Sequence, residues 1–136
     1  MLKAGVNTYR CTFRSAEFYL TAAEAALELN DMDNARHYLT ELMKKRYLSA
    51  IYPTYEAEIL SMTQDELREE IYNERFRELA FEGHRWFDLR RTTRQELTKT
   101  YKGETYVLQK DDSRYTLRIP ADAIEANPGL EEENRE

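Results

Sequence analysis

Apolar residues recur at helical spacing in two neighbouring segments, one from Ser15 to about Leu29 and one after Asp33. Their apolar positions are Ala16, Tyr19, Leu20, Ala23, Ala26 and Leu27, and then Ala35, Tyr38, Leu39, Leu42 and Met43. Ser15 and Asp33 are the expected N-caps, because short polar side chains accept hydrogen bonds from the first backbone N–H groups of a helix. Asn30 and Asp31 separate the two segments. A loop this short predicts that the two helices pack antiparallel.

The helix pair, residues 12–47, resembles one tetratricopeptide repeat. Its first helix is rich in alanine, which lets a second helix approach closely. A single repeat cannot bury its own faces, and such arrays need about three repeats for stability. No second copy is visible in the sequence. The pair must therefore pack on the helix that begins at Thr63, on a partner chain or on a further part of the protein. For the chain alone we expect apolar surface left open, with self-association or a marginal fold.

The segment from Thr63 to Arg91, residues 63–91, carries a helix, a bend and a second helix. Thr63 and Glu66 form a capping box, which marks the start of the helix, and Gly83 permits the bend. The first helix is apolar on two sides, with Leu67 and Ile71 on one side and Tyr72, Phe76, Leu79 and Ala80 on the other. This pattern predicts a buried central helix that lies between neighbours.

Four glutamates, Glu70, Glu74, Glu78 and Glu82, follow one another at i, i+4 spacing along this helix. Adjacent like charges destabilise a helix, so cations must face the stripe. The candidate partners are Arg68, Arg75, Arg77, Arg85, Arg90, Arg91 and Arg14. In this interpretation Glu78→Ala costs about 3 kcal/mol or more, because it leaves a buried arginine without a partner.

Two reactive interpretations of the same segment are weaker. A di-iron centre requires Glu-x-x-His, whereas Glu82 and His84 are only two positions apart, and His37 is remote in sequence. Acid–base catalysis by Glu78 with Glu82, or by Glu82 with His84, lacks a nucleophile motif, and nearby arginines would lower carboxylate pKa values. We therefore predict no catalytic, metal-ligating or cofactor-binding residue.

Two further groups of apolar residues lie before the Thr63 helix and after its bend. Before it, Tyr47, Tyr52 and Tyr55 lie in a connector (residues 47–59) that contains Pro53. These rings could stack on a sugar or a peptide, or they could cover the open edge of the helix pair. After the bend, Trp86, Phe87 and Leu89 predict an apolar anchor, with Asp88 close enough to pair with Arg85 or Arg91.

The remainder of the chain predicts a hairpin at residues 104–120 and an irregular tail at 121–136. The two expected strands are Tyr106–Leu108 and Tyr115–Ile119, on either side of the turn at residues 111–113, with a loop at 92–103. Residues 121–126 can form a short helical turn, and residues 1–11 a strand or a loose lead-in.

The net charge of −6 argues against nucleic acid as a partner. The compact basic run Lys44–Arg46 is explained by the dipole at the end of the second helix. Cys11 is the sole cysteine, which excludes an intrachain disulfide. The chain as given shows neither the apolar run of a signal peptide nor a lipid-anchor motif at Cys11.

Three ordered segments resemble the RagB/SusD nutrient-binding family. They are NERFRELAFEGHRWFDLRR at 73–91, FRSAEFYLTAAEA at 13–25, and YTLRIP at 115–120 with NP at 127–128. Arg118 replaces the usual proline of the closing motif, and Glu133 the usual glutamine. The resemblance covers only the C-terminal portion of such proteins, so we expect one domain, residues 1–136, of a larger SusD-like protein.

This resemblance implies a surface-exposed outer-membrane lipoprotein of Bacteroidetes that binds starch-like glycans, other nutrients or peptides and catalyses nothing. Its implied partner is a TonB-dependent, SusC-like transporter. It fixes no ligand-binding residue in this region. The expected fold is mainly α, with a tetratricopeptide-like helix pair, a buried central helix, a small β-hairpin and an irregular tail. The alternative is a stand-alone tetratricopeptide-like module that binds a protein partner.

Overall fold

The computed structural model describes residues 14–133, which form two compact units that divide between Arg85 and Trp86. The expectations for the lead-in at residues 1–11, for Cys11 and for the motif residue Phe13 lie outside the described residues. The chain is mainly helical with one small antiparallel hairpin, which confirms the expected fold class. No helix in the described part has the length and apolar content needed to span a membrane.

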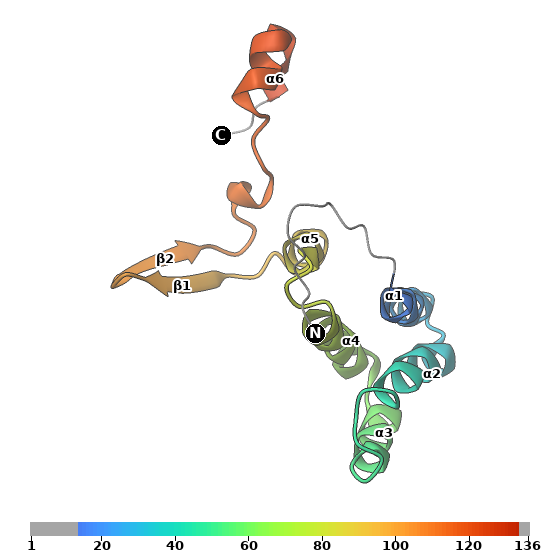
Figure 1. The fold of residues 1–136 in the computed structure, drawn as a ribbon. Helices are drawn as coiled ribbons and strands as arrows, with labels where there is room; N and C mark the ends of the chain where they lie inside the picture. Colours follow the sequence, from blue (N-terminus) through green and yellow to red (C-terminus); the bar gives the residue numbers. More distant parts are fainter. Residues whose placement is uncertain (1–13, 134–136) are drawn as a thin grey trace. The chain divides into compact units, whose positions relative to one another are not determined.

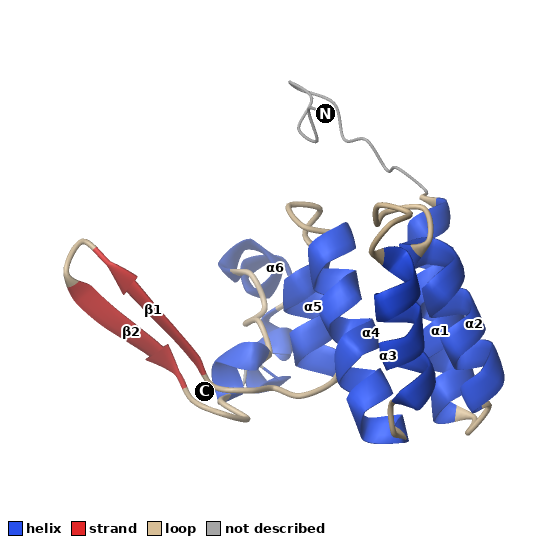
Figure 2. Ribbon diagram, turned by 90° about the horizontal axis from the view of Figure 1, so that it is seen from below, coloured by secondary structure: helices blue, strands red, loops and turns tan. Residues whose placement is uncertain are grey.

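Four complete helices lie in the described part of the first unit, residues 14–85 (Figures 1 and 2). They are α1 (Ser15–Glu28), α2 (Met32–Met43), α3 (Tyr52–Ser61) and α4 (Gln64–Glu78). Helix α1 packs on α2 and α4, and α2 also packs on α3 and α4. The core residues are Ala16, Leu20, Ala23, Ala26, Leu27, Ala35, Leu39, Leu42, Met43, Tyr52, Ile59, Leu67 and Ile71. The helix pair thus buries its apolar faces against α3 and α4.

Both N-caps of the helix pair are residues other than the predicted Ser15 and Asp33. The N-cap of α1 is Arg14, which makes no side-chain cap, and Ser15 is already helical. Asp31, not Asp33, caps α2 by accepting a hydrogen bond from the backbone N–H of Asn34 at 3.2 Å. The left-handed φ of +61° at Asn30 ends the first helix early enough for the second to begin at Met32.

Helix α3 occupies most of the segment expected to be a connector. Pro53 lies in its first turn, where the missing N–H has no intrahelical acceptor and the fixed φ suits a helix. Tyr52 and Ile59 point into the core and attach α3 to the unit. Pro53 therefore stands at the start of a helix, whereas the sequence pattern predicted that it lies in a non-helical connector.

Helix α4 begins with the predicted capping box at Thr63 and Glu66. Leu67 and Ile71 are fully buried, as expected for the first apolar side. The second side is covered in part within the described residues, since Leu79 is 3% exposed whereas Phe76 remains 52% exposed. The helix ends at Glu78, and the predicted bend follows with left-handed φ at Gly83 (+86°) before α5 (His84–Arg91) begins.

The second unit, from Trp86 onward, contains a stacked aromatic pair. The ring of Trp86 lies 5.2 Å from that of Tyr115, at an interplanar angle of 15°. Tyr115 is fully buried and its hydroxyl donates to the carbonyl of Gln95. Leu89 is also buried, whereas Phe87 is exposed, so the expected apolar anchor is only partly formed.

The hairpin lies earlier in the chain than predicted. Strand β1 (Leu97–Tyr101) falls in the expected loop and pairs with β2 (Glu104–Leu108), with Tyr101 opposite Glu104. The two-residue turn between them, Lys102 and Gly103, has positive φ at both positions, which suits the twist of paired strands. This turn selects the preceding segment as the partner of β2.

The expected second strand at Tyr115–Ile119 does not form. A short 3-10 helix η1 (Ser113–Tyr115) stands at its start, and Asp112 caps it by accepting from the N–H of Arg114 at 2.8 Å. The tail contains α6 (Ala121–Ala126), the predicted helical turn, and a second 3-10 helix, η2 (Pro128–Glu133).

Candidate functional site

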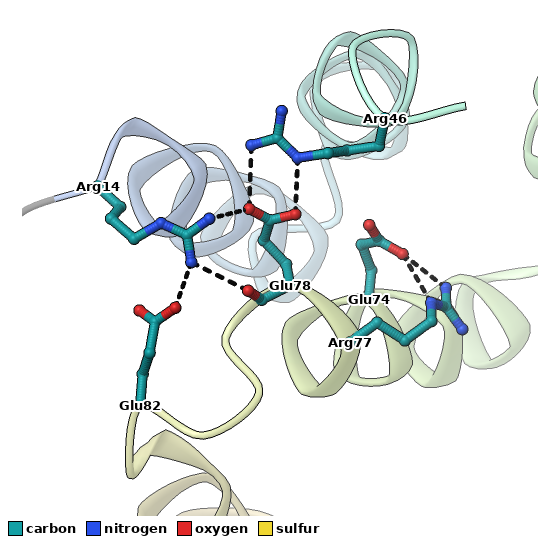
Figure 3. Close-up of polar contacts among 6 residues, drawn as sticks. All are labelled: Arg14, Arg46, Glu74, Arg77, Glu78 and Glu82. Atoms are coloured by element: carbon teal, nitrogen blue, oxygen red, sulfur yellow. Dashed lines mark hydrogen bonds and ion pairs between the residues drawn. The ribbon is translucent and has the colours of Figure 1, made fainter. Parts of the chain in front are cut away.

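The glutamate stripe of α4 is held by arginines in the first unit, as the sequence predicts (Figure 3). Glu74 and Glu78 are buried, with 3% and 9% of their surface exposed. Glu82 lies beyond the end of α4, in the bend, so the stripe is not carried by one continuous helix. Its carboxylate still joins the network, because Arg14 reaches it.

Glu78 accepts from two guanidinium groups on different elements. Arg14, just before α1, donates to the Glu78 carboxylate and, at 3.0 Å, to the backbone carbonyl of Glu78. Arg46, after α2, donates through Nε at 2.8 Å and Nη2 at 3.0 Å (Figure 3). These charge-assisted bonds join the start of α1, the end of α2 and the end of α4.

The interpretation of Arg46 as a helix-dipole residue is incomplete. Its hydrogen bond to Glu78 raises the pKa of the Arg46 guanidinium. A bidentate geometry on a buried carboxylate is a specific contact, whereas a dipole interaction requires only proximity. The sequence offered one signal for this role: arginine rather than lysine at the last position of the basic run.

Arg77 holds the other end of the stripe. Its Nε and Nη2 lie 2.8 and 2.7 Å from Glu74 Oε2, and Nη2 also contacts Glu70. Burial acts to lower the pKa of Arg77, but the bonds to Glu74 and Glu70 outweigh it, and the pKa is raised. Arg77 therefore bridges two carboxylates that lie one helical turn apart on α4.

The other candidate arginines make different contacts. Arg68 pairs with Glu28 and Asp65, and the guanidinium of Arg85 lies 4.7 Å from the centre of the Phe76 ring. Arg75 Nη1 lies 3.4 Å from Thr21 Oγ1. In the second unit Arg91 binds Asp88 at 2.8 Å, one of the two pairings expected for this carboxylate.

The histidines and carboxylates do not gather into a ligand set. His84 Nδ1 lies 3.8 Å from Glu17 Oε1, and His37 packs beside the ring of Tyr38. Among residues 14–133 no group of three or more histidine, cysteine or acidic side chains is placed to hold a metal ion. Glu78 and Glu82, the suggested acid–base pair, share the guanidinium of Arg14. The network is thus organised to hold helices in position.

Two adjoining hollows lie beside this network in the first unit. One, of about 260 Å³, is lined by Arg46, Tyr47, Glu74, Arg77 and Glu78. The other, of about 230 Å³, is lined by Met43, Tyr47, Tyr55, Glu58, Ile59, Met62, Glu70 and Arg77. Tyr47 and Arg77 line both, so the two hollows are neighbours.

The three connector tyrosines divide into two sets. Tyr52 is buried, and its hydroxyl donates to Glu56 at 2.8 Å and lies 3.3 Å from the carbonyl of Thr40. Burial, together with the bond to Glu56, raises the pKa of Tyr52 to about 12. Tyr47 and Tyr55 instead lie against each other at an interplanar angle of 51°, with ring centres 4.5 Å apart. Tyr52 therefore closes the edge of the helix pair, while the other two rings border the hollows.

Comparison with known proteins assigns this architecture to a family. The model of the SusD family matches residues 3–135, and the chain belongs to that family. A curated relative, the SusD-like protein P25 of Formosa agariphila, is 40% identical over 80 residues, which are 59% of this chain and 14% of the relative. A crystal structure of a SusD-like carbohydrate binding protein from Bacteroides vulgatus is 25% identical, with a TM-score of 0.57.

The solved structure covers 91% of this chain, while the chain covers 30% of that protein. The chain thus spans less than a third of either relative. The resemblance of the three sequence motifs to the RagB/SusD family is confirmed.

Proposed function

We propose that this chain is the part of a SusD-like nutrient-binding protein that supports glycan capture at the outer membrane. The family match over residues 3–135 carries the proposal. The structural relative described as a carbohydrate binding protein supports the ligand class. In this role the protein acts by binding and leaves its ligand chemically unchanged.

The proposed setting is the cell surface, as a lipoprotein of the outer membrane that hands oligosaccharide or peptide to a TonB-dependent, SusC-like transporter. Co-purification of the tagged natural protein from outer-membrane fractions tests this setting. We expect a transporter of that class in the complex and loss of the protein upon protease treatment of intact cells. Recovery in the cytosolic fraction contradicts the proposal.

The direct test of ligand class is isothermal titration calorimetry of the full chain against purified oligosaccharides, preceded by a glycan array. We expect saturable binding to at least one glycan class. A stand-alone protein-interaction module is the second candidate, and the exposed side chains of Phe18, Phe76 and Phe81 favour it. No saccharide or peptide binding, together with a stable protein complex, supports that candidate instead.

A further inference from the structure

We infer that the two hollows beside Tyr47 and Tyr55 form a subsite for one uncharged sugar residue of a glycan, stacked on these rings. The inference rests on the proposed glycan-binding function and locates a site for it. The sequence offered Tyr47 and Tyr55 as possible stacking rings, and the structure adds the lining from α2, α3, α4 and the segment after α2.

The two rings provide the apolar part of the subsite. Tyr55 is 38% exposed, and Tyr47, which packs partly on the core, lines both hollows. Their interplanar angle of 51° leaves them tilted, so they do not cover each other as a parallel stack would. A pyranose presents C–H groups on its faces, and an aromatic ring is the surface that such groups pack against.

The polar part of the subsite consists of side-chain nitrogen and oxygen atoms that take no part in the arginine–glutamate hydrogen bonds. Nη1 of Arg46, Nη1 of Arg77 and Oε1 of Glu74 have no hydrogen-bond partner among the residues that the structure describes. Figure 3 shows these atoms pointing away from the drawn partners. The hydroxyls of Tyr47 and Tyr55 likewise lack a partner within residues 14–133.

Glu74 supplies the acceptor of the proposed subsite. Its carboxylate is 3% exposed as a residue, and only Oε2 is occupied, by Arg77. Oε1 is not among the fully buried side-chain atoms that lack a partner, so water reaches it and a ligand hydroxyl can replace that water. Sugar hydroxyls both donate and accept, so they match a lining that presents guanidinium donors, a carboxylate acceptor and phenolic hydroxyls.

The charge of the lining selects uncharged sugars. Four carboxylates, from Glu58, Glu70, Glu74 and Glu78, line the hollows, against two guanidinium groups, from Arg46 and Arg77. Both guanidinium groups are already bound to these carboxylates. A uronate or sulfate would therefore meet net negative charge, which disfavours its binding.

The volumes limit how much of a glycan enters. Hollows of about 260 and 230 Å³ are smaller than most ligand sites, which begin near 300 Å³. We therefore expect one residue of a chain to occupy the hollows while its neighbours remain outside.

The test is calorimetry and saturation-transfer NMR with the full chain. The probes are neutral hexasaccharides of glucose, mannose, galactose and xylose, a matched set of uronic-acid hexasaccharides, and a tripeptide mixture. We expect a neutral hexasaccharide to bind, and Tyr55→Ala to raise its dissociation constant about tenfold, as expected when a stacking ring is lost. Tyr47→Phe, which keeps the packing and deletes one hydroxyl, should raise it about threefold.

The matched control is Tyr101→Ala, which removes a 64% exposed tyrosine from the second unit. It should leave the dissociation constant unchanged. Circular dichroism melting of each variant separates loss of binding from loss of fold, and Tyr47→Phe covers the case in which Tyr55→Ala unfolds.

The outcomes separate the subsite from the function on which it rests. Neutral-glycan binding that survives both variants in folded protein overturns the subsite but leaves glycan binding in place. Preferential binding of uronates, or of peptides at these tyrosines, overturns it equally. The absence of any saccharide binding by the unmodified chain overturns both proposals.

Discussion

Glu78 is the residue on which the first unit's polar contacts converge. It accepts from Arg14 and Arg46, which come from the beginning and the end of the helix pair in the sequence. We expect Glu78→Ala to lower the free energy of unfolding by about 3 kcal/mol, measured by urea denaturation. The value lies at the low end for a buried pair, because the side chains of Arg14 and Arg46 are 26% and 42% exposed and can reach water.

Asp65→Ala is the matched control for this substitution, since the Asp65 carboxylate pairs with Arg68 at 94% exposure. An exposed ion pair contributes little, so its loss should cost less than about 0.5 kcal/mol. A cost below about 1 kcal/mol for Glu78→Ala would show that solvent, and not the carboxylate, stabilises the arginines.

Tyr52 makes the stability depend on pH in the alkaline range. Its pKa in the folded chain is raised from 10 to about 12 by burial and by its bond to Glu56, so the folded state favours the neutral phenol. The contribution is fully present below pH 10 and is lost as pH rises from 10 to 12. The free energy of unfolding lost over this interval through the ionisation of Tyr52 is about 2–3 kcal/mol.

The measurement compares unfolding free energies of the unmodified chain and Tyr52→Phe at several pH values from 9 upward. Phenylalanine cannot ionise, so the variant should lose stability less steeply between pH 10 and 12. Parallel pH profiles for the two proteins would contradict the assignment. Tyr101→Phe, at an exposed position on β1, should follow the unmodified profile.

At the scale of elements, the hairpin depends on its turn. Strands β1 and β2 are exposed along almost their whole length, so little packing supports them. Gly103 has a φ of +84°, a conformation that costs other residues about 1–2 kcal/mol. No neighbouring atom lies within 4 Å of a Cβ added there, so the backbone angle alone decides the effect.

Gly103→Val should therefore weaken the cross-strand contacts between Thr98 and Val107, observed as NMR cross-peaks between their Cα protons. Gly103→Asn is the control, because asparagine tolerates the left-handed region, and it should keep the contacts. Equal cross-peak intensities in both variants would show that the turn does not limit the hairpin.

At the scale of the whole molecule, large apolar side chains remain uncovered within residues 14–133. They are Phe18, Leu29, Leu48, Leu60, Phe76, Phe81, Phe87 and Leu117, each more than half exposed. Apolar surface of this extent promotes association. The chain should self-associate in a concentration-dependent manner, as measured by light scattering coupled to gel filtration.

Phe81→Ser tests the cause, because Phe81 is 98% exposed in the bend after α4 and supports no core contact. The substitution should reduce the fraction of associated chain, whereas Tyr101→Ser should change it less. A monomer at all concentrations, with a sharp and high melting transition, would contradict this expectation.

Local signals were sufficient for much of the fold. The helical spacing of Leu20, Leu27 and Leu39 predicted the pair α1 and α2, and the capping box at Thr63 located α4. The pairing of the glutamate stripe with arginines also followed from sequence, because like charges at i, i+4 require opposite charges nearby. The helical spacing, the capping box and the stripe itself depend on residues close together along the chain, whereas Arg14 lies 64 positions from Glu78.

Tertiary contacts decided the rest. Two segments could pair with β2, one before it and one after it in the sequence. The left-handed turn at Lys102 and Gly103 favours the segment before it, β1. Arg46 reaches Glu78 across 32 positions, and the hollows at Tyr47 and Tyr55 combine residues from three helices and the segment after α2. By itself, the sequence determined α1, α2, α4 and the family, whereas α3 was expected to be a connector. The partners of Arg46 and the two tyrosines were determined only by the packing of helices, which brings distant residues within reach.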